Sequence, residues 1–153
     1  MSDNILIGKT IIKIEMTADS EQIRFFLREG DEPIVARCDA DCCSHTWIEN
    51  VSDPGAIIGH TIVRAGDVDM PDLGSPNEYD CIAYYGFEIA TAMGRCIIDY
   101  RNSSNGYYGG WLHWTPDLDD TDWNPSFYGG VYGQNDHPDA EWKDIQDHEA
   151  SDF

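Results

Sequence analysis

Short apolar runs separated by polar turns recur along the chain, and most of them have the length of a β-strand. Apolar residues alternate with polar ones inside them, and β-branched and aromatic residues are frequent. The runs that predict strands are residues 5–16, with a bend at Gly8, and residues 22–27, 33–37, 57–64, 82–91 and 95–100. The first three follow one another through short polar turns, which predicts an antiparallel meander.

Two segments carry helix signals instead. Ser44 is a suitable N-cap for a short helix that extends through residue 50, with Trp47 and Ile48 on its apolar side. A second short helix is predicted within residues 139–148. We therefore expect an α+β fold that consists mainly of antiparallel β-sheet, or of a partly open barrel, with one or two short helices.

The stretch of residues 99–114 differs in chemistry from the rest of the chain. Asn105-Gly106 is a strong signal for a two-residue turn, because both residues tolerate a positive φ. The stretch is therefore interpreted as a hairpin, or as a loop that is entered and left by strands. Gly109-Gly110 allows a backbone or a ligand to come close. Two readings stay open: a tight hairpin whose aromatic residues cap the core, or a ligand-binding loop.

The charge of the chain is extreme for its length. There are 29 acidic and 9 basic residues among 153, so the formal net charge is −20. This balance argues against non-specific binding to nucleic acid or to an anionic membrane. Residues 117–153 hold eleven of the acidic residues against the single base Lys143, and so half of the net charge. We divide the chain into an α+β ligand-binding domain, residues 1–116, and an acidic, aromatic-containing C-terminal extension, residues 117–153, packed on that domain or trailing from it.

Targeting signals are absent from the sequence. No window approaches the ~20 consecutive apolar residues of a membrane span, and the first residues lack the basic region and apolar core of a signal peptide. We expect a cytoplasmic protein. In that compartment the five cysteines are predicted to be thiols, and an odd number leaves at least one of them unpaired.

The densest group of chemically reactive side chains is Cys38, Cys42, Cys43 and His45. Zinc favours such ligands, but their spacing is irregular, and adjacent cysteines often only pack in a core. Cys43 beside His45 at a helix N-terminus could be a reactive thiol, although the sequence identifies no orienting partner. The sequence also lacks a phosphate-binding loop, a dinucleotide fingerprint and a zinc-protease helix. The sequence identifies no catalytic residue, and we expect no cofactor and no metal.

Arginines are informative because bases are scarce. All six lie on or beside predicted strands: Arg24, Arg28, Arg37, Arg64, Arg95 and Arg101. One interpretation is that they form surface ion pairs with nearby acids. The other is that some bind phosphate, since a guanidinium suits bidentate phosphate contacts and an aromatic face beside it suits a base.

Two motifs together resemble a small family of phage and prophage proteins. They are Asp41-Cys42-Cys43 and the run from Arg101 to Gly110, with its Asn-x-x-Asn-Gly-Tyr-Tyr-Gly-Gly core. The chain is similar in particular to the Thoeris anti-defence sponge proteins. The resemblance implies a non-enzymatic protein that binds a cyclic ADP-ribose isomer made by bacterial TIR-domain proteins and holds it intact. It also implies possible binding of cyclic oligonucleotides and assembly as a dimer or hexamer.

The resemblance also implies where the ligand binds. Asn102, Asn105 and an arginine, either Arg28 or Arg101, would contact ribose and phosphates, and an aromatic face would contact adenine. The expected ligand-binding residues are Arg28, Phe87, Arg101, Asn102, Asn105, Tyr107 and Tyr108. Ser44, directly after the two cysteines, departs from the family pattern, in which an acid is expected.

Two other classes of function stay open. A charge of −20 could imitate a nucleic-acid backbone and block a basic host defence protein, such as a CRISPR component. A nucleotide-processing enzyme is the third possibility, and it would differ from a sponge by forming a product.

Overall fold

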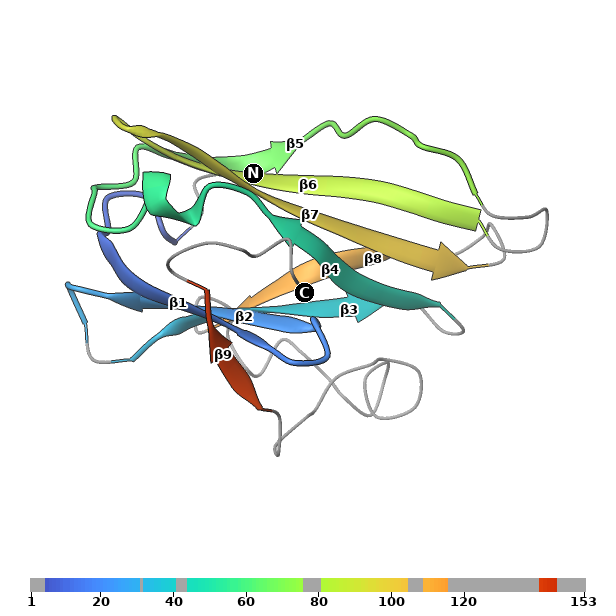
Figure 1. Ribbon diagram of the computed structural model, residues 1–153, viewed down its shortest axis with the longest axis horizontal. Coiled ribbons are helices and arrows are strands. Elements are labelled where there is room, and N and C mark those ends of the chain that lie inside the picture. Colours follow the sequence, from blue (N-terminus) through green and yellow to red (C-terminus); the bar gives the residue numbers. More distant parts are fainter. Residues whose placement is uncertain are drawn as a thin grey trace.

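The computed structural model shows two antiparallel β-sheets that pack face to face in two layers (Figure 1). It describes residues 5–30, 32–40, 44–75, 81–104, 109–115 and 141–145. The strands are β1 (Ile11–Thr17), β2 (Gln22–Leu27), β3 (Ile34–Ala40), β4 (His45–Val51), β5 (Arg64–Val68), β6 (Cys81–Thr91), β7 (Gly94–Ser104), β8 (Gly110–Thr115) and β9 (Trp142–Asp144). A single 3₁₀ turn, Pro54–Ala56, is the helical structure in this part of the chain.

The two sheets have different strand orders. One has five strands in the order β8-β3-β2-β1-β9, and the other has four in the order β4-β7-β6-β5. The consecutive pairing of β1, β2 and β3 confirms the predicted meander. In the four-stranded sheet, β5, β6 and β7 form a second meander and β4 lies beside β7, which is a Greek-key arrangement.

The prediction of an α+β fold was wrong, because the protein is all-β, and the two open sheets do not form a barrel. The segment that begins at Ser44 forms β4 in place of a helix. Thr46, Ile48 and Val51 are buried in it, while His45 and Glu49 are exposed. That alternation fits one buried sheet face, and it outweighs the capping signal of Ser44.

The second predicted helix, within residues 139–148, contains a strand. β9 pairs with the edge of β1, the backbone N–H of Ile145 donates to the carbonyl of Ile14 at 3.0 Å, and the Ile145 side chain is buried in the core. The predicted extension, residues 117–153, therefore contributes a strand to the five-stranded sheet. No helix in the described segments has the length and apolar character needed to cross a bilayer.

Two predicted strand boundaries also differ. The first strand begins at Ile11, because Gly8 has a φ of +89° and the chain turns there. Residues 57–64 make only isolated bridges, at Ile58 and Thr61, before β5 begins. By contrast, residues 22–27 form β2 with the predicted bounds.

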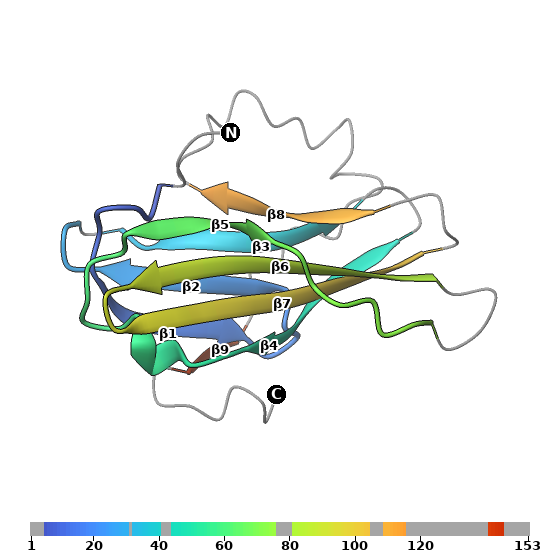
Figure 2. The ribbon, with the colours of Figure 1, turned by 90° about the horizontal axis from the view of Figure 1, so that it is seen from above.

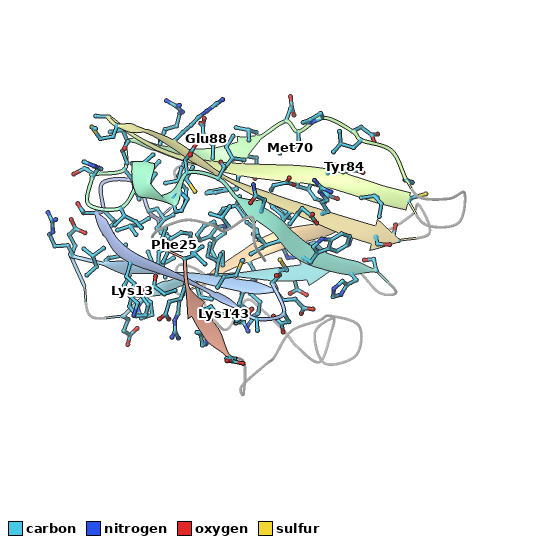
Figure 3. The ribbon with its side chains drawn as sticks, viewed as in Figure 1. Lys13, Phe25, Met70, Tyr84, Glu88 and Lys143 are labelled. Carbon is cyan, nitrogen blue, oxygen red and sulfur yellow. The ribbon has the colours of Figure 1, made fainter. Side chains whose placement is uncertain are left out.

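The core between the layers is centred on three aromatic residues from three strands. The Trp114 ring lies 6.0 Å from that of Phe25, nearly parallel to it, and 4.8 Å from that of Phe87. Figure 3 shows Phe25 between the two sheets. Trp114 belongs to β8 and Phe87 to β6, so this cluster joins one sheet to the other. Aromatic rings bury large areas and favour such offset contacts.

The stretch of residues 99–114 does not form a hairpin. β7 pairs with β4 and β6 in one sheet, while β8 pairs with β3 in the other, so the chain crosses between the layers. The predicted turn at Asn105-Gly106 lies outside the described residues. The stretch is thus a loop entered and left by strands, which was the second reading of the sequence.

A close contact at Gly110 holds the point where the chain crosses. Asn102 donates from Nδ2 to Thr46 Oγ1 at 3.0 Å, and Thr46 Oγ1 donates to the carbonyl of Asp39 at 2.9 Å. A Cβ atom at Gly110 would lie 1.8 Å from Thr46 Oγ1 and 2.9 Å from the Asp39 carbonyl oxygen. Only glycine therefore fits between β3, β4 and β7.

We expect Gly110→Ala to lower the free energy of unfolding by about 3 kcal/mol, because the added methyl group must displace Thr46 and the backbone behind it. Gly66→Ala is the matched control. An added Cβ at Gly66 meets no atom within 4 Å, so we expect a change within ~0.5 kcal/mol. Chemical denaturation of both variants measures the difference, and equal stabilities would show that the contact at Gly110 is not close.

Glu88 lies on the outer face of the four-stranded sheet and is clamped by two arginines. Its carboxylate accepts from Arg64 Nε at 2.8 Å and from Arg95 Nη1 at 2.9 Å. The Glu88 side chain is 7% exposed, whereas both arginines are 63% exposed. The hydrogen bond from Arg64, aided by Arg95, holds the pKa of Glu88 below its usual value of 4.5.

This clamp predicts a pH dependence of stability. Because the folded pKa of Glu88 lies below the unfolded one, its contribution is present above pH 4.5 and is lost as the pH falls through the folded pKa. We expect Glu88→Gln to cost about 1 kcal/mol at neutral pH, since the exposed guanidinium ends are screened by water. The cost should vanish in acid. Parallel curves of stability against pH for Glu88→Gln and the parent would contradict this. Glu32→Gln, at an exposed site, is the control and should follow the parent's curve.

Candidate functional site

A cleft of about 410 Å³ opens at the edge of the four-stranded sheet, facing the first residues of β8. Four aromatic residues and two carboxylates contribute to its walls. The lining residues are Asp67, Val68, Asp69, Met70, Tyr84, Tyr85, Gly86, Tyr100, Gly110 and Trp111. They come from both sheets and from four separate stretches of the chain.

A difference in strand length creates the cleft. β5 ends at Val68, opposite Gly86, whereas β6 continues in that direction to Cys81. Tyr84 and Tyr85 are consequently at an edge of β6 that has no strand beside it within the described residues. From Asp69 onward the chain leaves the sheet edge and passes over the outer face of β6 and β7 (Figure 2).

Three contacts hold residues 69–75, which we call the crossing loop, against β6. The side chain of Met70 lies over Gly86, where a Cβ would be 2.6 Å from its sulfur. The Tyr84 hydroxyl donates to the carbonyl of Gly74. The N–H of Ile82 donates to Ser75 Oγ at 2.9 Å. Figure 3 shows Met70 and Tyr84 following one another along the four-stranded sheet.

The inner part of the cleft is formed by two stacked tyrosines. The rings of Tyr85 and Tyr100 are 5.2 Å apart and 21° from parallel. The N–H of Gly110 donates to the Tyr85 hydroxyl at 3.4 Å. Burial, with a smaller contribution from the charge of Asp67, raises the pKa of Tyr100 well above its usual range. Its hydroxyl therefore stays neutral at physiological pH.

The charged groups that line the cleft are the carboxylates of Asp67 and Asp69. Arg101 lies beside one of the lining residues, since its guanidinium is 4.9 Å from the centre of the Tyr84 ring. Asp99 holds it with two hydrogen bonds, of 3.1 and 3.3 Å, and Glu49 is 4.0 Å away. The hydrogen bonds from Arg101 to Asp99 raise the pKa of Arg101, so its charge is fixed.

The cleft has the size and the chemistry of a small-ligand site. Its volume lies in the usual range of such pockets. Tyrosine and tryptophan rings can stack on a flat ring, and the aspartates can accept hydrogen bonds from hydroxyl or amino groups.

The structure places the expected ligand-binding residues apart. Arg101 lies beside the cleft wall, and Asn102 is fully buried in the contact at Gly110. Phe87 packs in the core against Trp114. Asn105, Tyr107 and Tyr108 lie outside the described residues.

Arg28 lies at the other end of the molecule from Arg101. It follows the end of β2 that pairs with Ile34, the first residue of β3. Ala40, the last residue of β3, pairs with Gly110 at the cleft. The length of β3 separates these two ends, so Arg28 and Arg101 are not brought together around one phosphate.

Sequence reasoning missed most of the cleft. Tyr84, Tyr85, Tyr100 and Trp111 meet only because β6, β7 and β8 are neighbours across two sheets. One local signal was available: residues 69–72, directly after β5, contain two aspartates and a proline, a composition that favours a chain leaving a sheet.

The cysteine group is not assembled by the described residues. Cys38 is buried in the core, while His45 is half-exposed and lies 3.4 Å from Glu21; Cys42 and Cys43 lie outside the described residues. Burial raises the pKa of Cys38, and it raises that of Cys96 to about 12, so both remain protonated thiols. Among the residues with described positions, no group of three metal-binding side chains converges.

Removal of the Tyr84 hydroxyl should loosen the crossing loop without unfolding the sheet. Tyr84→Phe keeps the ring beside Arg101 but loses the hydrogen bond to Gly74, worth about 1 kcal/mol. We expect about fivefold faster amide hydrogen exchange within residues 69–75. The midpoint of global thermal unfolding should change little. Unaltered exchange would mean that other contacts hold the loop.

Comparisons with known proteins give a family and a viral relative. The model of a family described as a domain of unknown function (DUF7448) matches residues 4–114. An uncharacterized protein of Acanthamoeba polyphaga mimivirus is 30% identical over 115 residues, which cover 71% of this chain and 90% of the mimivirus protein. No solved structure matches.

Proposed function

The chain belongs to the DUF7448 family, and we propose that it is a non-enzymatic protein that binds a nucleotide signal in the cleft and holds it intact. The observation that carries the proposal is the lining of the cleft, where aromatic faces and carboxylates meet in one space of about 410 Å³. A base can stack on the rings of Tyr85 or Trp111. The ribose hydroxyls can donate to Asp67 or Asp69.

The energies of such contacts are sufficient for specific binding. Stacking on an aromatic side chain contributes about 1–3 kcal/mol per base, and a hydrogen bond to a carboxylate contributes about 1.5–3 kcal/mol. One stacked ring and two such bonds give about 4–9 kcal/mol, which at its upper end corresponds to micromolar binding before ordering costs. Phosphates would lie at the rim of the cleft, away from the carboxylates of Asp67 and Asp69.

The side chains around the cleft support holding rather than turnover. Neither a thiol nor an imidazole is among the lining residues that the structure describes. The Tyr100 hydroxyl keeps its proton, and the described lining residues offer Asp67 and Asp69 no serine, threonine or cysteine to activate.

A viral relative supports a role during infection. The mimivirus protein shares most of its length with this chain. We therefore propose that the bound molecule is a host immune signal. The class that the sequence resemblance favours is a cyclic ADP-ribose isomer, with cyclic oligonucleotides as further candidates.

The test is calorimetric titration of the purified full chain with ADP-ribose, its cyclic isomers, and cyclic di- and trinucleotides, followed by chromatography of the released ligand. We expect one nucleotide to bind and to be recovered unchanged. Trp111→Ala should weaken binding at least tenfold, because Trp111 offers a ring at the rim of the cleft. Leu73→Ala is the matched control, since Leu73 is exposed on the crossing loop but does not line the cleft.

Two outcomes would overturn the proposal. A recovered but altered nucleotide would show an enzyme. No binding to any nucleotide, together with salt-dependent capture of a basic defence protein, would favour the nucleic-acid mimic that the charge of −20 also suggests.

A further inference from the structure

We propose that the cleft selects a ligand ring that carries a positive charge, such as an N-alkylated adenine or a pyridinium ring, over the neutral ring of the same shape. This inference rests on the proposed function and deepens it, because it states that the nucleotide ring that enters the cleft is positively charged. It rests on the placement of Asp67 and Asp69 among aromatic faces.

The direction of the Asp67 side chain follows from the strand register. Asp67 pairs directly with Phe87, and residues directly opposite each other in an antiparallel pair place their side chains on the same face of the sheet. The Phe87 side chain points into the core, where it packs against Trp114. Asp67 therefore directs its carboxylate inward at the mouth between the two sheets, toward Tyr100, whose ionisation it opposes.

The negative charge of the cleft is not compensated by the described residues. Neither Asp67 nor Asp69 forms an ion pair within the described segments, and no lysine or arginine lines the cleft. Arg101 lies beside Tyr84, but its charge is taken up by Asp99 and Glu49. Both carboxylates are exposed at the mouth of the cleft, so their attraction for a cation acts over ~8 Å at physiological salt and weakens as salt is added.

Aromatic rings add to the preference for a cation. The rings of Tyr85 and Trp111 line the cleft and are at least partly exposed, and the negative face of an aromatic ring attracts a cation within ~6 Å of its centre. The chain already uses this contact, since the guanidinium of Arg24 lies 4.0 Å from the centre of the Trp142 ring. A flat cationic ring is the ligand that can use the stacking faces and the carboxylates together. A phosphate would be repelled by Asp67 and Asp69, and so it stays at the rim.

The experiment compares two isomers by calorimetric titration. 1-Methyladenosine is protonated and cationic at neutral pH, whereas N6-methyladenosine is neutral and has the same non-hydrogen atoms. We expect the cation to bind at least tenfold more tightly, a difference of about 1.4 kcal/mol, and the ratio to fall as salt is raised. Asp67→Asn and Asp69→Asn should each reduce the ratio severalfold. Glu32→Gln, which removes one charge from an exposed site away from the cleft lining, should leave it unchanged.

A second pair of probes separates this inference from the proposed function. 1-Methylnicotinamide is cationic and nicotinamide is neutral, and neither contains a ribose. Tighter binding of the cation in both pairs supports the inference. Equal binding of the two adenosine isomers overturns it while leaving a nucleotide site in place. Binding of 1-methylnicotinamide without binding of either nucleoside supports the charge selection but overturns the nucleotide function, and binding of no probe overturns both.

Discussion

The close contact at Gly110 is the constraint on which the rest of the structure depends. β7 belongs to the four-stranded sheet and β8 to the five-stranded sheet, so the chain must pass from one layer to the other within a few residues. The chain is held at this point because Gly110 contacts Thr46 of β4, Asn102 of β7 and the Asp39 carbonyl of β3. This contact sets the position of Trp111 at the cleft and of Trp114 in the core.

The electrostatics of the fold follow from a shortage of cations. Among the described residues, arginines pair with carboxylates on the outer faces of the sheets: Arg24 with Glu15, Arg64 and Arg95 with Glu88, and Arg101 with Asp99. These pairs neutralise partly buried carboxylates, which would otherwise be costly to bury. The aspartates of the cleft are exposed to water instead, and so they need no partner for the fold to be stable. Within the described residues, charge that no ion pair compensates thus lies at the cleft.

Local pattern predicted some of the strands but not which strands pair. The alternation in residues 22–27 gave β2 with its bounds, because one face of that strand is buried and the other is not. The helix predicted from Ser44 was wrong. A capping signal depends on one residue, whereas the alternation of buried and exposed side chains extends over the whole of β4. The turn signal at Asn105-Gly106 does not determine whether the flanking strands pair with each other or belong to different sheets. Phe87 was expected at a ligand, but its strand position faces Trp114 in the core, a contact made across a long sequence separation.

The same reasoning explains why the cleft could not be read from a motif. Its walls depend on the difference in length between β5 and β6, and that length is set by pairing rather than by composition. The net charge of −20 repels any anionic ligand. At physiological salt this repulsion acts only over ~8 Å, so recognition must come from short-range contacts. At that range the cleft presents rings and carboxylates. A ligand that is anionic at one end can therefore enter only if its other end is flat and at least neutral. If the proposed nucleotide binds, its ring would therefore enter the cleft and its phosphates would stay outside.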